Sequence, residues 1–168
     1  GGISVYVNYQ IVSTVMELSR NGNPAFEILC VKCTCEQSDT CASMVPFIIF
    51  ALYHPPKAMY ATASLIAYLE ESIETIRHAN PDCLFFLAGD LNQLDTQFLT
   101  SELGLSLLTT AATHGDKVLD KIFISEDNVY EAFSFKTTIK TKHFAIVAHP
   151  SCNAERSKSC VGCKIAVY

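Results

Sequence analysis

Residues 83–92, with the sequence Cys-Leu-Phe-Phe-Leu-Ala-Gly-Asp-Leu-Asn, constrain the fold more than any other stretch of the chain. A short apolar run that ends in turn-forming residues is typical of a strand buried on both faces. Gly89 allows a tight turn at the strand's end, and Asp90 and Asn92 follow two positions apart. In an extended chain their side chains would point the same way and suit a hard cation or a phosphoryl oxygen. The alternative is an Asx turn that caps the next helix.

Residues 62–79 carry the clearest helical pattern in this chain of 168 residues. Apolar side chains recur there at helical spacing and predict one buried stripe, made of Leu65, Leu69, Ile73 and Ile76. A shorter helix is expected over residues 96–103. Further strands are expected over residues 1–9, 11–18, 26–34, 45–53, 105–109, 119–125, 132–138 and 145–149. Many strands with few helices favour an α/β fold in which sheets pack on each other and helices lie outside.

The length suits one domain with a sizeable core. We expect this domain over residues 1–150 and a cysteine-containing tail over residues 151–168, where the composition changes. A strand-like alternation already begins at residue 1, so we expect an N-terminally truncated domain.

The net charge of −5 at pH 7 argues against a general affinity for nucleic acid. Residues 1–113 hold 4 basic and 11 acidic side chains, whereas residues 114–168 hold 8 basic and 6 acidic ones. Lys136, Lys140 and Lys142 lie close together in the second part. This cluster suits either a solvated surface or a rim that faces phosphate groups.

No apolar stretch approaches the ~18 residues that a membrane span needs, and no signal peptide is visible. We therefore expect no membrane partner, and an intracellular protein rather than a secreted one. Without a secretory signal, disulfides are not the default state of the eight cysteines.

Two C-x-x-C pairs, Cys30/Cys33 and Cys160/Cys163, raise the alternative of a small zinc-binding module. Cys30 and Cys33 fall within a predicted strand, where a spacing of three residues puts side chains on opposite faces. Buried free cysteines that behave as small apolar groups are the commoner case. We therefore favour free thiols over a zinc site.

Three polar side chains stand where strands should be apolar. Tyr53 ends a predicted strand just before two prolines, Asp120 interrupts another, and His143 precedes the apolar run 144–147. Each alone has an ordinary structural explanation, as a core tyrosine, a capping aspartate or a surface histidine. Their order along the chain carries more information than any one of them.

Four segments, taken in order, resemble the endonuclease/exonuclease/phosphatase superfamily. They are Tyr-His-Pro-Pro at 53–56, Leu-Ala-Gly-Asp-Leu-Asn at 87–92, Thr-His-Gly-Asp-Lys-Val-Leu-Asp-Lys-Ile-Phe-Ile-Ser at 113–125 and Thr-Lys-His at 141–143. Within this superfamily, the four segments most resemble retrotransposon-type, apurinic-endonuclease-like domains. The resemblance covers roughly residues 1–150 and corresponds to the C-terminal two thirds of such a domain.

The resemblance implies a four-layered α/β sandwich, with two mixed β-sheets packed face to face and helices outside. It also implies Mg²⁺-dependent hydrolysis of a phosphodiester in nucleic acid or another substrate. Asp90 would bind the metal and orient or deprotonate the attacking water, while Asn92 and Tyr53 would hold the phosphate. His143 would pair with Asp120, which fixes its tautomer.

Two departures from the family pattern lower the expected activity. The metal-binding glutamate of the family lies upstream of where this chain begins, and Lys142 stands where the family has an aspartate. Lysine could contact the phosphate, but it repels a metal ion. We therefore expect weak or absent Mg²⁺ binding and a weak or inactive hydrolase. The alternative is a non-catalytic remnant that binds a partner, and an uncovered sheet edge would favour self-association.

Overall fold

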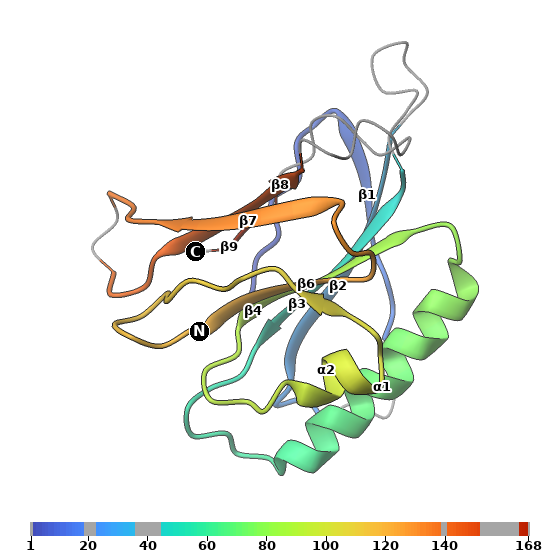
Figure 1. Ribbon diagram of the computed structural model, residues 1–168. Helices are drawn as coiled ribbons and strands as arrows, with labels where there is room; N and C mark the ends of the chain where they lie inside the picture. Colours follow the sequence, from blue (N-terminus) through green and yellow to red (C-terminus); the bar gives the residue numbers. More distant parts are fainter. Residues whose placement is uncertain (1, 19–22, 36–44, 139–140, 152–164, 168) are drawn as a thin grey trace.

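The computed structural model describes the chain except for residues 1, 19–22, 36–44, 139–140, 152–164 and 168 (Figure 1). The described part contains nine strands and two helices. In chain order these are β1 (Ile11–Val15), β2 (Glu27–Cys35), β3 (Phe47–Tyr53), α1 (Thr62–Ala79), β4 (Leu84–Asp90), α2 (Gln97–Ser101), β5 (Ser106–Leu107), β6 (Asp120–Ile124), β7 (Tyr130–Phe135), β8 (Ala145–Pro150) and β9 (Ile165–Val167).

The larger sheet has six strands in the order β1-β2-β3-β4-β6-β5. Its one parallel pair is β3 with β4, and the other four pairs are antiparallel. Helix α1 connects β3 to β4, as a parallel pair requires a crossover. The sheet is therefore mixed, and the strand–helix–strand segment is a crossover unit.

The smaller sheet contains β7, β8 and β9 in that order, with both pairs antiparallel. It lies on one side of the larger sheet, and α1 and α2 lie on the other (Figure 1). The predicted α/β class with two packed sheets is confirmed. Within the described part of the chain, the outer helices cover the larger sheet alone.

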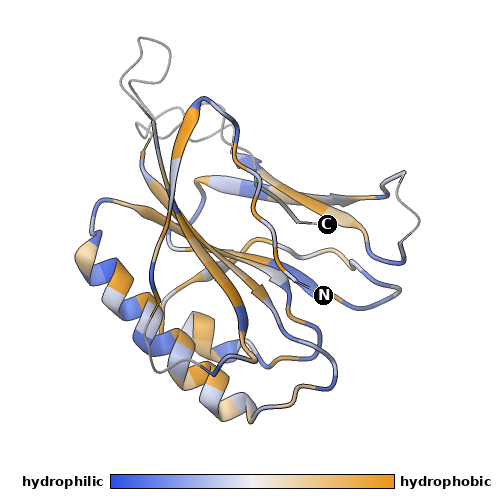
Figure 2. Cartoon of the chain, turned by 180° about the vertical axis from the view of Figure 1, so that it is seen from behind, coloured by the Kyte–Doolittle hydropathy of each residue, from blue (hydrophilic) through white to orange (hydrophobic). Residues whose placement is uncertain are grey.

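Two apolar clusters hold these layers together. The first lies between α1 and the larger sheet, and it includes the predicted stripe of Leu65, Leu69, Ile73 and Ile76. The second lies between the two sheets and includes Phe86, Ile122 and Ile146. The colouring by hydropathy in Figure 2 shows α1 with one polar and one apolar side and the strands largely apolar.

Strand β4 belongs to both clusters, as its uninterrupted apolar sequence predicts. Phe85 and Leu87 pack toward the helices, whereas Leu84, Phe86 and Ala88 pack toward the smaller sheet. All five are buried, so β4 occupies the centre of the molecule. Asp90 is the last residue of β4, so the central position of this strand determines where the Asp90 side chain lies.

Cys30 and Cys33 lie on opposite faces of β2, one in each apolar cluster. Both are free and buried, and burial raises the pKa of their thiols to about 12 and about 11, respectively. This arrangement disfavours joint binding of a zinc ion. Cys160 and Cys163 lie outside the described residues.

The predicted strand over residues 1–9 is wrong for residues 2–8, which form no strand. Val5 and Val7 pack against the cluster between the sheets, so the alternating sequence reflects alternating burial without a hydrogen-bonded ladder. β9 lies within residues 151–168, where 152–164 are not described, so the separate tail stays a prediction. None of the helices in the described part is long and apolar enough to cross a membrane.

Candidate active site

The candidate site lies where β4 ends beside the start of β6. These strands are antiparallel, and their register places Asp90 directly opposite Asp120. Directly opposed residues project from the same face of a sheet, so the two carboxylates face the space between the sheets. Asp120 is 3% exposed, and Asp90 is half-buried.

Gly89 is required for this arrangement because β3 passes very close to it. A Cβ atom at position 89 would overlap the backbone carbonyl oxygen of Leu52 and lie 2.8 Å from its carbonyl carbon. The absence of a side chain therefore lets β3 and β4 approach until the His54 N–H donates to the Asp90 carbonyl oxygen at 2.9 Å. The close approach brings the end of β3 next to Asp90.

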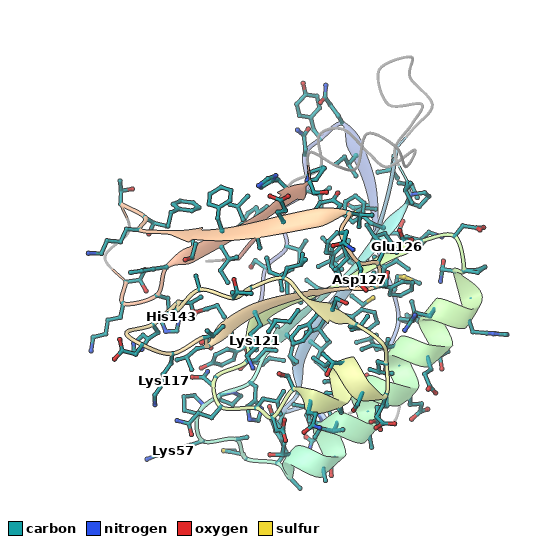
Figure 3. The ribbon with its side chains drawn as sticks, in the orientation of Figure 1. Lys57, Lys117, Lys121, Glu126, Asp127 and His143 are labelled. Carbon is teal, nitrogen blue, oxygen red and sulfur yellow. The ribbon has the colours of Figure 1, made fainter. Side chains whose placement is uncertain are left out.

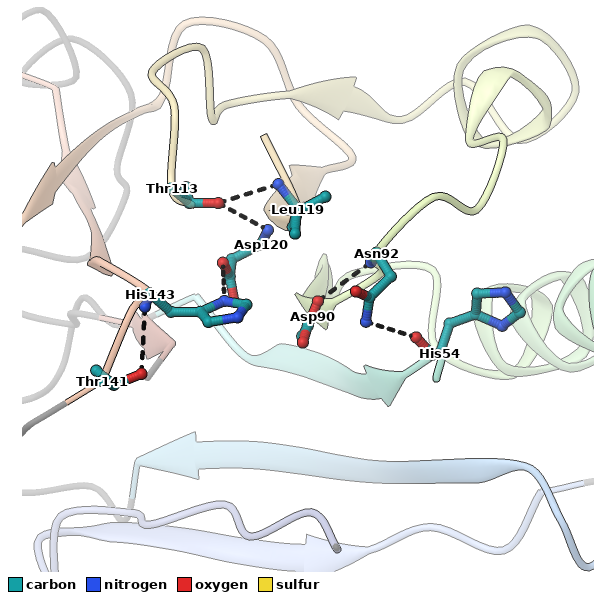
Figure 4. A network of polar contacts seen from close by, with 8 residues as sticks. All are labelled: His54, Asp90, Asn92, Thr113, Leu119, Asp120, Thr141 and His143. Atoms are coloured by element: carbon teal, nitrogen blue, oxygen red, sulfur yellow. Dashed lines mark hydrogen bonds and ion pairs between the residues drawn. The ribbon is translucent and has the colours of Figure 1, made fainter. Parts of the chain in front are cut away.

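Asn92 is placed by an Asx turn, the second of the two interpretations of the sequence, and not by an extended chain. Its φ of 47° is left-handed, and its backbone N–H donates to Asp90 Oδ1 at 3.1 Å, which forms an Asx turn. The Asn92 Nδ2 group donates to the His54 carbonyl oxygen at 2.8 Å. Figure 4 shows the Asp90 carboxylate between the side chain of Asn92 and the ring of His143. The Asx turn and the convergence of polar groups thus occur together.

His143 reaches Asp120 from the loop before β8. The distance between His143 Nδ1 and Asp120 Oδ2 is 2.8 Å. Thr113, which is fully buried, accepts the backbone N–H groups of Leu119 and Asp120 on its Oγ1, each at 3.0 Å. Its carbonyl oxygen accepts the N–H of Phe144 at 2.8 Å, so Thr113 ties together the segments that carry Asp120 and His143.

The three titratable side chains form one compact group. One ligand atom each from Asp90, Asp120 and His143 lies within 4.8 Å of the others. Burial, followed by the charge of Asp120, raises the pKa of Asp90, while the Asn92 N–H and His143 act in the opposite direction. Two facing carboxylates are therefore held together at an electrostatic cost that a cation would relieve.

Tyr53 lies on the same face as Asp90, at the end of the neighbouring strand. The parallel register pairs Ala51 with Ala88, and Tyr53 and Asp90 follow these residues two positions later on the same face.

His54, the residue after Tyr53, is buried, and its Nδ1 lies 3.0 Å from the Tyr60 hydroxyl oxygen. Burial lowers the pKa of His54, although Asp90 opposes this shift. His54 is thus a structural support for Asn92.

Exposed lysines lie next to His143 in the chain or on the same side of the molecule. Lys142 is exposed next to His143, whose backbone N–H donates to Thr141 Oγ1 at 3.2 Å. Lys57 and Lys117 are also exposed and lie on the same side of the molecule as His143 (Figure 3). The lysines suit an anionic ligand.

No protein-family model matches the sequence, and no curated protein matches it. In structure, the chain is similar to the human Nocturnin catalytic domain with bound sulfate, at 11% identity and a TM-score of 0.47. It is also similar to an endonuclease/exonuclease/phosphatase family protein from Bacteroides thetaiotaomicron, at 12% identity and a TM-score of 0.42. These matches cover 84% and 72% of this chain but 54% of each of the other two, so the chain spans about half their length.

Sequence reasoning gave no role to Thr113, His114 or His54. The ring centroids of His114 and His143 lie 4.8 Å apart at an angle of 51°. One sequence signal could have pointed to Thr113 and His114: they are two polar residues at the start of segment 113–125, just before the strand that carries Asp120. The contacts of His54 depend on the close approach of β3 to β4, which a sequence pattern does not encode.

We predict that the ring of His114 restricts the orientation of His143. His114→Ala should let the His143 ring rotate away from Asp120, whereas His114→Phe should keep the ring contact. The ¹⁵N chemical shifts of His143, which report its tautomer, should change in the alanine variant and stay close to wild type in the phenylalanine variant. Unchanged shifts in both variants would contradict this role.

Proposed function

We propose that this protein has the site of a divalent-metal-dependent phosphodiester hydrolase, with turnover held low by Lys142. The observation that supports it best is the compact group of Asp90, Asp120 and His143 within 4.8 Å, at the end of a central buried strand. These groups and Asn92 come from three separate segments, in the order expected from the resemblance.

The donor set fits a metal ion. The pKa of Asp90 is raised by burial and by Asp120, so its negative charge lacks sufficient compensation from the protein alone. Asp90 would hold the ion, and Mg²⁺ or Mn²⁺ would be the natural choices for a carboxylate-rich site. Such an ion supplies charge neutralisation at the phosphate and lowers the pKa of a bound water.

The residues of the chain would divide the remaining tasks. Asp90 Oδ1 accepts the Asn92 N–H, which leaves Oδ2 to orient or deprotonate a water molecule. The Asn92 side-chain amide donates to the His54 carbonyl oxygen and also interacts with Asp90, and from this position it would hold the phosphate together with the Tyr53 hydroxyl. Asp120 would stabilise a charged His143 beside the developing negative charge.

Lys142 should weaken metal binding because it adds a positive charge next to His143. We predict that Lys142→Asp raises Mn²⁺ affinity, by about tenfold if the reversed charge contributes about 1.4 kcal/mol at a partly exposed position. Isothermal titration calorimetry measures the change directly. Lys136→Asp makes the same change of charge at an exposed position six residues earlier in the same β7–β8 connection, not adjacent to His143, and should have a smaller effect. Equal effects of the two variants would contradict a local role for Lys142.

Hydrolysis assays test the proposed function. With Mg²⁺ or Mn²⁺, the unmodified chain should cleave bis(4-nitrophenyl) phosphate and duplex, single-stranded or abasic DNA slowly at best, and Asp90→Ala should remove any such activity. Rapid cleavage lost in Asp90→Ala would contradict the inhibitory role of Lys142. Metal-dependent cleavage that survives Asp90→Ala would overturn the assignment of the site.

The exposed position of Lys142 favours one alternative, a domain that binds phosphate groups without cleaving them. This alternative predicts that Lys142→Asp weakens the binding of a phosphodiester ligand. The hydrolase proposal predicts that the same variant strengthens metal binding. The two measurements on one variant separate these functions.

A further inference from the structure

The outer face of the smaller sheet exposes two phenylalanines. Alternation along β7 turns Tyr130 and Ala132 toward the apolar cluster between the sheets and turns Phe133 and Phe135 the other way. Phe133 is 49% exposed and Phe135 is 38% exposed. β7 and β8 form the layer farthest from α1 and α2, so this face points away from the body of the domain (Figure 1).

The exposed rings form a row with a histidine from β8. The ring centroids of Phe133 and Phe135 lie 6.0 Å apart at 39°, and those of Phe133 and His149 lie 5.6 Å apart. We call Phe135, Phe133 and His149 the aromatic row. Neighbouring aromatic rings on a solvent-facing sheet provide flat surfaces on which unpaired bases can stack.

The charge next to the aromatic row differs between its two ends. Exposed Lys136 follows Phe135 directly, and exposed Lys142 lies three residues before Ala145, the register partner of Phe135. At the other end, Glu131 pairs with His149. Phosphate groups are therefore favoured at the Phe135 end, which is also the end of the sheet nearest to His143 in the chain.

We propose that the aromatic row binds single-stranded nucleic acid, with bases stacked on Phe133 and Phe135 and phosphates near Lys136 and Lys142. A single strand is the expected ligand because the bases of a duplex already stack on one another. The aromatic character and the adjacent lysines distinguish this surface from an aliphatic patch that buries itself against a second copy of the chain. The aromatic row itself lies outside the candidate active site, Lys142 is shared by the two, and binding does not require cleavage.

The test is fluorescence anisotropy with labelled twelve-nucleotide oligo(dT) and oligo(U), at low salt and with EDTA. Phe133→Leu and Phe135→Leu keep an apolar side chain but remove the ring, and each should weaken binding at least about fivefold. Phe133→Tyr keeps the ring and should bind like wild type. Tyr9→Leu removes an aromatic ring that is 94% exposed elsewhere and is the matched control. Binding should also weaken with salt.

Three outcomes would overturn the proposal. These are equal binding by the Leu and Tyr variants of Phe133, no preference for single strands over a duplex of the same length, or no binding at low salt. Light scattering on the same samples detects dimers, and a wild-type dimer that Phe133→Leu dissociates would assign the surface to a second copy instead. Binding is measured with EDTA and without turnover, so failure of the metal-binding or hydrolysis tests at the active site leaves this result intact.

Discussion

Replacing Gly89 with alanine should lower the free energy of unfolding by about 3 kcal/mol or more. A methyl group at this position would overlap the carbonyl oxygen of Leu52, which belongs to the backbone of β3 and has no rotamer to escape into. The clash can be relieved only by separating β3 from β4 at the centre of the larger sheet. The same shift would break the 2.9 Å hydrogen bond from the His54 N–H to the Asp90 carbonyl oxygen, so the site should be lost with the fold.

Gly104→Ala is the matched control. Gly104 has a left-handed φ of 62°, but a Cβ atom there would meet nothing within 4 Å. Backbone strain alone should cost about 1–2 kcal/mol. Urea denaturation measures both variants, and equal midpoints would contradict the close approach of the two strands.

Asp90→Asn should have opposite effects on stability and on metal binding. Burial and the charge of Asp120 raise the pKa of Asp90 in the fold, so the native state holds this proton more tightly than the unfolded chain does. The fold therefore loses stability as the pH rises from the unfolded pKa of Asp90 to its higher folded pKa, and the full loss is present above the folded value. The neutral asparagine should raise the unfolding temperature at pH 7, and this advantage should disappear as the pH falls to the ordinary carboxyl range, about 3–4.

The same substitution should weaken Mn²⁺ binding by at least about tenfold, because it removes the carboxylate that would hold the ion. Asp82→Asn removes an exposed carboxylate before β4 and should change neither property appreciably. Thermal melts across pH, and calorimetric Mn²⁺ titrations at neutral pH, give both results. A less stable Asp90→Asn variant at pH 7 would contradict the described electrostatics, since it would mean that ionised Asp90 is well compensated in the native state.

The periodicity of the sequence was sufficient to predict α1 and the buried strand β4. In both, one dominant pattern determines local structure and burial together: the four-residue stripe in α1 and the continuous apolar run in β4. The sequence does not predict the parallel pairing of β3 with β4, because strand spacing does not distinguish a crossover from an antiparallel neighbour. The packing of residues 2–8 without a ladder was missed for a similar reason, since alternation reports burial and not hydrogen bonding.

Within the site, the residues predicted from motif order were easier to find than the residues that support them. Asp90, Asp120 and His143 stand out because each is polar beside an apolar run, and the structure brings them together. Thr113 Oγ1 accepts two backbone N–H groups six and seven residues later, and the His54 carbonyl oxygen accepts the Asn92 side chain. These contacts exist only after the strands have paired. The identity of Thr113 and His54 alone gives no sign of these contacts.

The most direct test is to locate Mn²⁺ by paramagnetic broadening of amide signals in ¹⁵N-labelled protein. The amide signals of Asp90, Asn92, Asp120 and His143 should broaden first and at the lowest Mn²⁺ concentration, and Asp90→Asn should prevent this. Broadening that begins at the acidic face of α1, around Glu70, Glu71 and Glu74, would contradict a metal site between β4, β6 and the His143 loop.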